Sequence, residues 1–133
     1  MHYRLTVKND ILNIKPNQYI DAPKQFFIDC LNNPNNKLFS IIDNQRIAAI
    51  IVTSCFHKDF YRIGIVVSDD IKISDLKYIK QVTKELIELY GVKFLCSEGE
   101  THKVKDKFHE LMGFEIERNY GTYKRWKFKG LEY

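Results

Sequence analysis

Two histidines lie near the C-terminal end of the chain, in a segment with helical apolar spacing. His102 and His109 occur in the run THKVKDKFHELMGF, residues 101–114. Imidazole exchanges protons near neutral pH, so His109 is a candidate general acid. The alternative is structural, because the apolar spacing places His109 at the margin of the buried face. His102 stands in the first helical turn, a position that normally faces solvent.

Two carboxylates and a further histidine are candidate general bases: Glu98, Glu100 and His57. Glu98 follows the apolar run VKFLC at residues 92–96, which predicts a short, buried parallel strand. Open sheets place ligands beyond the carboxyl ends of such strands. The alternative for Glu98 is a solvated loop carboxylate. Neither metal-ligand spacing nor a nucleophile elbow around a serine occurs in the sequence, so we expect no metal site.

Hydrophobic periodicity predicts the elements that would position these residues. In chain order, we expect strands at 3–7, 37–43, 46–55, 60–67 and 92–96, and a hairpin of 114–117 with 123–129. Helices are expected at 21–31, 74–90 and 101–112, and the polar segment 9–19 is expected to be a loop with at most one helical turn. The fold class is therefore α+β: an antiparallel meander followed by β-α-β-α-β around one mixed, splayed sheet, in a single domain of residues 1–133.

Capping residues mark the ends of the predicted helices. Asp21, Ser74 and Thr101 are the expected N-caps, and Gly91 and Gly113 are the expected stops. The buried stripes are expected to consist of Ile79, Val82, Leu86 and Tyr90 in one helix, and of Val104, Phe108, Leu111 and Met112 in the next.

The strands carry cues of their own. Residues 46–55 are apolar on both alternating faces, which is typical of a central strand covered on both sides. A tight hairpin turn is expected at 43–45. In the last strand, Trp126 and Phe128 share one face.

Composition narrows the class of protein. The chain has 133 residues, 44% of them hydrophobic, and a net charge of +4. No apolar run approaches the roughly 20 residues of a membrane span, and the first residues do not resemble a signal peptide. We interpret Cys30, Cys55 and Cys96 as reduced core residues. We therefore expect a cytoplasmic protein without a membrane partner.

The last part of the chain is basic. Residues 101–133 hold eight lysines and arginines against five acidic residues. Arg125, Lys127 and Lys129 share a strand face with Tyr123 and would suit nucleic acid. The alternative is a solvated edge strand whose lysines discourage pairing with another sheet. The aromatic residues of this strand would equally suit pairing with a second copy, which makes a homo-oligomer an open expectation.

The order of elements over residues 37–129 resembles the GNAT (Gcn5-related) N-acetyltransferases. The matching parts are YRIGIVV, the loop SDDIKI, the helix SDLKYIKQVTKELIELYG, VKFLC, THKVKDKFHELM and the junction Gly113-Phe114. The resemblance implies acetyl-CoA as cofactor. Its pantetheine arm would add to the strand edge at Ile65, Val66 and Val67. Its pyrophosphate would lie at the helix beginning at Ser74, close to Lys72.

The same resemblance assigns roles to the candidate groups. His109 stands where many members carry the tyrosine that protonates the leaving thiolate, and His102 stands where they often carry an asparagine. Glu98 would deprotonate an amine-bearing acceptor. The family's loop before the helix is basic and rich in glycine. Here residues 68–75 contain no glycine and include Asp69 and Asp70, which oppose an anion.

A narrower resemblance is to small GNAT-like proteins of short-tailed bacteriophages. It rests on the length, the absent phosphate loop and the aromatic-basic last hairpin. Three functions therefore stay open: an acyl-CoA-dependent N-acyltransferase, a non-catalytic virion or head-assembly component that contacts other virion proteins, and a nucleic-acid-binding module. A phage protein would lie in the host cytoplasm or in the virion.

Overall fold

The computed structural model describes residues 1–17, 22–57, 60–90 and 94–129, with only the backbone at 55–57, 60–61, 90 and 94–99. The elements are β1 His2–Leu5, α1 Lys8–Asn13, α2 Lys24–Asn32, β2 Asn36–Asp43, β3 Arg46–His57, β4 Phe60–Val67, α3 Ile73–Tyr90, β5 Phe94–Glu100, α4 Lys103–Leu111, β6 Phe114–Asn119 and β7 Tyr123–Phe128. This order confirms the predicted α+β class. The segment expected to be mainly a loop contains the short helix α1. No helix in the described ranges is long and apolar enough to cross a membrane.

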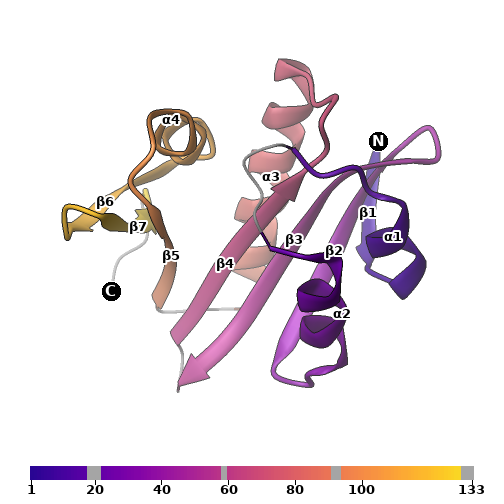
Figure 1. The fold of residues 1–133 in the computed structure, drawn as a ribbon, viewed down its shortest axis with the longest axis horizontal. Coiled ribbons are helices and arrows are strands. Elements are labelled where there is room, and N and C mark those ends of the chain that lie inside the picture. The colour runs from indigo at the N-terminus through magenta and orange to yellow at the C-terminus, as the bar shows by residue number, and fades with distance from the viewer. Residues whose placement is uncertain (18–21, 58–59, 91–93, 130–133) are drawn as a thin grey trace.

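The strands form one mixed sheet in the order β1-β2-β3-β4-β5-β7-β6. Only β4 and β5 pair in parallel, and every other neighbouring pair is antiparallel. The meander is thus β1 to β4, and β5 to β7 form a second part beside it (Figure 1). The expectation of an edge strand at residues 123–129 is wrong. Strand β7 pairs with β5 on one side and β6 on the other, so β6 is the edge.

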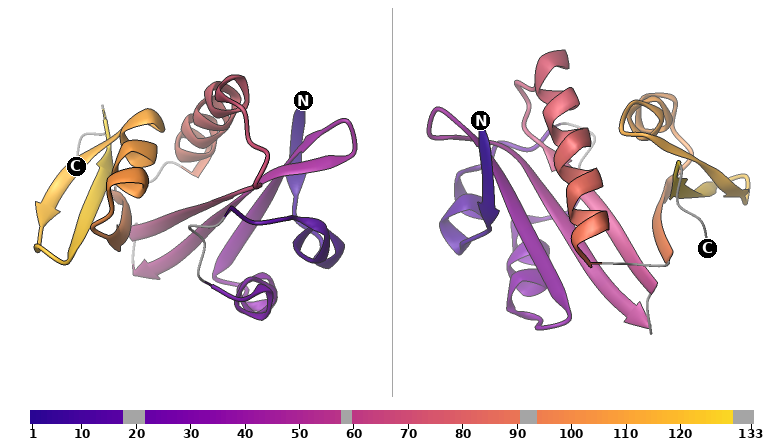
Figure 2. Two further views of the ribbon diagram at one scale, coloured as in Figure 1. Left: turned by 45° about the horizontal axis from the view of Figure 1, so that its top comes forward. Right: turned by 180° about the vertical axis from the view of Figure 1, so that it is seen from behind.

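Helices cover both faces of the meander (Figure 2). Side chains alternate along β3, and the two sets enter different clusters. Ala49 and Ile51 are buried with Ile79 and other residues of α3. Ile50 and Val52 are buried with residues of α1 and α2, such as Phe27. This alternation confirms that β3 is a central strand covered on both sides.

Helix α3 begins one residue earlier than predicted. Its first residue is Ile73, so Ser74 lies inside the helix and is not its N-cap. The carboxylate of Asp75 accepts from the backbone N–H of Lys72 at 3.0 Å. Asp75 thus satisfies a donor at the helix start, a role that the sequence prediction had given to serine.

Helix α4 is capped by a histidine. Its N-cap is His102, whose Nδ1 accepts from the N–H of Val104 at 3.2 Å. Thr101, the predicted cap, instead donates its hydroxyl to the carbonyl of Gly121 at 2.8 Å. The cap therefore moves one residue along the chain because the threonine has a partner in the hairpin beyond.

Two turns have the expected left-handed backbone. Gly113 ends α4 with φ +94°. A Cβ there would lie 3.0 Å from a side-chain carbon of Lys80 and 3.3 Å from the ring of Phe128, so only glycine fits without strain. Asn44 and Gln45, with φ of 48° and 69°, make the predicted hairpin turn between β2 and β3. The predicted cap Asp21 and stop Gly91 lie outside the described residues.

Candidate functional site

Strands β4 and β5 separate after a short parallel ladder. They pair at Phe60–Phe94, Tyr61–Leu95 and Arg62–Cys96. Beyond that point β5 pairs with β7 as far as Glu100, whereas residues 63–67 of β4 pair with β3. Within the described strands, nothing pairs with the other edge of residues 63–67. The predicted splay is present, and Figure 1 shows the two strands diverging.

The hydrogen-bonding pattern decides which backbone groups reach the open edge. The N–H of Ser68 donates to the carbonyl of Ala48 on β3, at 2.9 Å. In an antiparallel ladder, alternate residues direct both backbone groups to the same side. The even-numbered residues of β4 therefore face β3, and Ile63, Ile65 and Val67 face the open edge. Ile65 is the central one of the three.

The last part of this edge is covered by the chain's own N-terminal segment. The carbonyl of Val67 accepts from the N–H of Asn17 at 2.9 Å, and the N–H of Asp69 donates to the carbonyl of Lys15 at 2.8 Å. Pro16 and Ser68 form an isolated antiparallel bridge between these two bonds. We call residues 15–17 the strap. It ends the open edge at Val67.

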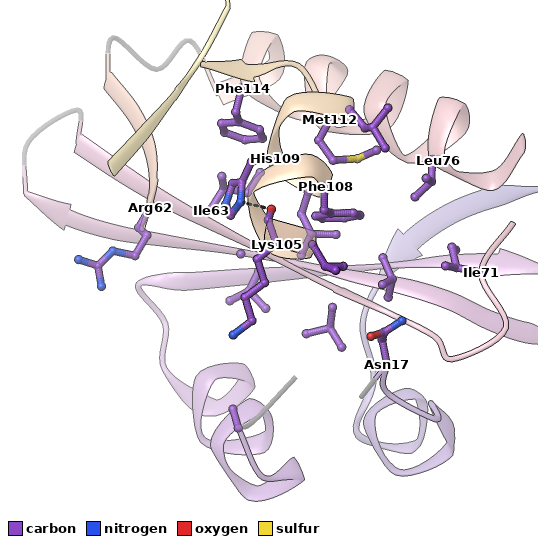
Figure 3. A pocket seen from close by; sticks show the side chains of 18 of the residues that line it. Asn17, Arg62, Ile63, Ile71, Leu76, Lys105, Phe108, His109, Met112 and Phe114 are labelled. Carbon is purple, nitrogen blue, oxygen red and sulfur yellow. Dashed lines mark hydrogen bonds between the residues drawn. The ribbon is translucent and has the colours of Figure 1, made fainter. Parts of the chain in front are cut away.

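The open edge lines a groove of about 880 Å³ (Figure 3). Its walls come from β4, α4, α2 and the start of α3. Gly64 and Val66 line it on one face of β4, and Ile63 and Val67 line it on the other, so the groove wraps around the strand edge. The apolar lining from other elements is made by Ala22, Phe26, Phe27, Cys30, Val52, Ile71, Leu76, Val104, Phe108, Leu111, Met112 and Phe114. Its volume and apolar lining are those of a small-molecule site.

The groove explains one error of the sequence prediction. The stripe of α4 was expected to be buried, and Met112 is buried, but Val104 and Leu111 are 43% and 49% exposed. These side chains line the groove and do not enter the core. Cations lie on the same helix: Lys103, Lys105 and Lys107 line the groove, and we call them the lysine rim.

Contacts with Lys105, Trp126 and Phe114 help to hold His109 in the groove wall. Its Nδ1 lies 2.9 Å from the carbonyl of Lys105, so Nδ1 carries the hydrogen that this bond requires. Its ring stacks on Trp126 and meets Phe114 edge to face. Burial lowers the pKa of His109, and the Lys105 carbonyl and the charge of Asp106 oppose this only in part. The imidazole is therefore neutral at pH 7, with its lone pair on Nε2.

The other predicted site residues fall into two groups. Ile65, Val66 and Val67, the residues predicted to contact the pantetheine arm, line the groove. Lys72, Ser74 and His102 are exposed and are not among its described lining residues.

The predicted base Glu98 was expected after the end of its strand, but β5 extends to Glu100, so Glu98 lies within β5, opposite Arg125 of β7. Its side chain, like that of His57, lies outside the described part of the structure. Among the described side chains, no three from His, Cys, Asp and Glu are placed to hold a metal ion.

The start of α3 carries a charge cluster that the sequence prediction missed. The guanidinium of Arg46 bonds to Asp70 at 2.6 Å, to Asp75 at 3.2 Å and to Asp43 at 3.4 Å. Ser68 donates its hydroxyl to Asp70 at 2.7 Å, and this bond together with Arg46 lowers the pKa of Asp70. Three carboxylates thus surround a single guanidinium. We call these four charged residues the Arg46 cluster.

Known proteins resemble this chain in structure but not in sequence. No protein-family model matches the sequence, and no curated protein is similar to it in sequence. The ribosomal-protein-S18-alanine N-acetyltransferase of Escherichia coli superposes with a TM-score of 0.71 at 15% identity, over 94% of this chain and 88% of that one. The chain has the GNAT fold. At this identity, the likeness shows the fold alone.

Two further GNAT-fold structures contain a cofactor. The PaiA N-acetyltransferase of Thermoplasma acidophilum, in complex with coenzyme A, gives a TM-score of 0.71 at 10% identity, over 95% of this chain and 98% of that one. The N-acetyltransferase PseH of Campylobacter jejuni, in complex with acetyl coenzyme A, gives a TM-score of 0.67 at 13% identity, over 97% of this chain and the whole of that one.

Proposed function

We propose that the protein is an N-acyltransferase that moves an acyl group from a thioester, such as acetyl-CoA, to an amine. The observation that carries this proposal is the open edge of residues 63–67 inside an apolar groove. An unpaired strand edge binds extended amide-containing chains. The pantetheine arm of CoA is such a chain, with two amides and a thioester at its end.

The backbone of β4 would hold the arm. Ile65 directs its N–H and its carbonyl to the open edge, and both can bond to the amides of the arm as a neighbouring strand would. Val66 and Val67 would supply apolar contact on either side of the edge. The strap ends the edge at Val67, so the arm would lie between that residue and the ladder with β5.

His109 would transfer a proton from the attacking nitrogen to the leaving sulfur. The amine nitrogen attacks the thioester carbon, a C–N bond forms, and the C–S bond breaks to release a thiolate. The nitrogen must lose a proton and the sulfur must gain one. Neutral His109 can accept the proton at Nε2 from the tetrahedral intermediate and, as the resulting general acid, give it to the leaving sulfur. Glu98 would deprotonate the incoming ammonium group.

Calorimetry and a thiol-release assay test this proposal. Acetyl-CoA is titrated into the protein up to millimolar concentration, and release of free thiol is then followed with a panel of polyamines and peptide amines. We expect heat of binding, and thiol release that depends on the amine. No heat and no thiol release at millimolar acetyl-CoA would exclude acetyl-CoA as the acyl donor. Heat without turnover on any amine would support the second candidate below.

A non-catalytic interaction module is the second candidate, and the Arg46 cluster favours it. Three carboxylates at the start of α3 oppose the pyrophosphate that a CoA-dependent enzyme of this fold would hold there. As a bacteriophage virion or head-assembly component, the protein would occur in purified particles at a fixed copy number. Quantitative mass spectrometry of such particles measures this.

Nucleic-acid binding has weaker support. Lys127 pairs with Glu115 at 3.6 Å, and Lys124 pairs with Asp106. These contacts neutralise part of the basic face that includes Arg125 and the exposed Lys129. Retention on DNA or RNA at low salt, falling steeply as salt rises, would be the expected sign of such a function.

A further inference from the structure

The Arg46 cluster and the groove meet at the start of α3, and together they restrict the acyl donor. Ile71 and Leu76 line the groove at this end. Asp70 and Asp75, which flank them in sequence, belong to the cluster. A donor lying along β4 with its thioester near His109 would leave the groove here (Figure 3).

Three of the backbone donors at this end have partners within the protein. The N–H groups of Ser68 and Asp69 bond to the carbonyls of Ala48 and Lys15. The N–H of Lys72 bonds to the carboxylate of Asp75. Residues 68–75 contain no glycine, so every one carries a Cβ that keeps a phosphate from the backbone. The N–H groups of Ser68, Asp69 and Lys72 are therefore not available to an anion.

The charges at this end repel an anion. Four carboxylates surround the helix start, from Asp43, Asp69, Asp70 and Asp75, against the cations of Arg46, Lys72 and Lys15. Two like charges about 6 Å apart repel by about 0.7 kcal/mol in bulk water, and by about 3 kcal/mol at an effective dielectric constant of about 20. A helix N-terminus attracts an anion by only about 0.3–1 kcal/mol. The repulsion from one carboxylate is therefore comparable with the attraction in bulk water and exceeds it at the lower dielectric constant.

The part of the groove around Ile65 matches the chemistry of the donor better than the start of α3 does. The open edge at Ile65 and the apolar side chains of Val104 and Phe108 suit the amide and methylene groups of a pantetheine arm. We propose that the donor is recognised through its pantetheine arm, and that the nucleotide diphosphate of CoA adds no binding at the start of α3. This inference rests on the proposed acyltransferase function and names its donor class: an acyl-pantetheine thioester.

Two sources share this chemistry, free acyl-CoA and an acyl group on the phosphopantetheine of an acidic carrier protein. The lysine rim is the cationic surface on the groove, and a carrier's acidic surface would meet it. Transfer rates are therefore measured with three donors: acetyl-CoA, acetyl-pantetheine, and an acetylated holo carrier protein. The measurements are made at about 0.5 M salt, where attraction to exposed lysines is largely screened.

We expect acetyl-pantetheine to match acetyl-CoA in kcat/KM within about tenfold. A preference for acetyl-CoA above tenfold overturns the inference and leaves the proposed function standing. If none of the three donors gives heat of binding or acyl transfer, the inference and the proposed function are both overturned. A carrier protein that exceeds acetyl-pantetheine at low salt, but not at high salt, supports the inference and identifies the carrier as the source.

A charge variant tests the cause directly. Asp70 is exposed, so Asp70→Asn removes a charge from the cluster with little risk to folding. We expect it to lower KM for acetyl-CoA at least threefold and to leave KM for acetyl-pantetheine unchanged. Glu85→Gln is the matched control, because Glu85 lies on the same helix about 18 Å from its start. An equal effect on both donors, or no effect on acetyl-CoA, contradicts the inference.

Discussion

The imidazole of His109 lies flat against the indole of Trp126, with ring centroids 4.7 Å apart and ring planes 5° from parallel. The stack joins α4 to β7 and covers one face of the histidine. Because Nδ1 is also bonded to the Lys105 carbonyl, the ring has a fixed orientation in the groove wall. A proton-transfer group needs such positioning to be effective.

The stack allows the protonation of His109 to be observed. Trp126 is the only tryptophan of the chain, so its emission reports on this site alone. Protonation places a cation against the indole face. We expect emission to change with pH and with a midpoint below 6.5, because burial lowers the pKa of His109. His109→Gln should abolish the change. A midpoint at or above 6.5 would contradict the neutral imidazole.

Removing the imidazole should reduce catalysis. We expect His109→Gln to lower kcat by 10²- to 10⁴-fold, the usual contribution of a general acid–base group. The activity of the unaltered protein should fall at low pH with a midpoint below that of an ordinary histidine, because burial lowers the pKa of His109. His102→Gln is the matched control on the same helix. His102 caps α4 and is not among the described lining residues of the groove, so its replacement should lower stability slightly and leave kcat within about threefold.

Gly64 allows the groove to be filled without disturbing the protein. A Cβ at Gly64 would meet no atom within 4 Å, and the residue lines the groove. We expect Gly64→Leu to abolish calorimetric binding of the thioester, because the side chain would occupy the space beside the strand edge. The melting temperature should stay the same or rise, since glycine weakens a strand. Unchanged thioester binding would show that the donor lies elsewhere.

Asp10 should contribute strongly to stability. It is 4% exposed, and its carboxylate accepts from Arg4 at 2.6 and 2.9 Å, from Ser40 at 2.8 Å and from the N–H of Val7 at 3.0 Å. Burial acts to raise the pKa of Asp10, but these partners together outweigh it and lower the pKa. We expect Asp10→Ala to cost about 2–4 kcal/mol in the free energy of unfolding at pH 7.

The pH dependence of this loss has a defined sign. A carboxylate whose pKa is lowered by folding stabilises the protein above its unfolded pKa, near 4, and loses that effect as the pH falls. The difference between the unaltered protein and Asp10→Ala should therefore shrink below about pH 4, as measured by urea unfolding. Asp29→Ala, at an exposed position of α2, should change stability by less than about 0.5 kcal/mol.

The arrangement of elements could be predicted because hydrophobic alternation is local. The run that became β3 is apolar on both faces, and this pattern alone indicates a covered central strand. The caps could not be predicted as reliably, because Asp75 and His102 compete with nearby Ser74 and Thr101 for the same role. Only the folded geometry shows which side chain reaches the open N–H.

The site was harder to predict for two physical reasons. Apolar periodicity does not distinguish a core from a groove, so Val104 and Leu111 were placed inside although they line the open site. The Arg46 cluster joins residues far apart in the sequence, from Asp43 to Asp75. The sequence indicated that Asp70 would be unfavourable to an anion. The sequence around Arg46 did not indicate that this arginine would hold the three carboxylates together.

The open edge of β4 also bears on how the protein avoids self-association. An unpaired strand edge is a template for strands of other molecules and a common origin of aggregation. Here the edge lies in the middle of the sheet, with α4 beside it and the strap across its end. An edge inside the sheet is less accessible to a second sheet than the outer edges at β1 and β6. Its placement inside the sheet thus limits amyloid-like pairing at this one edge.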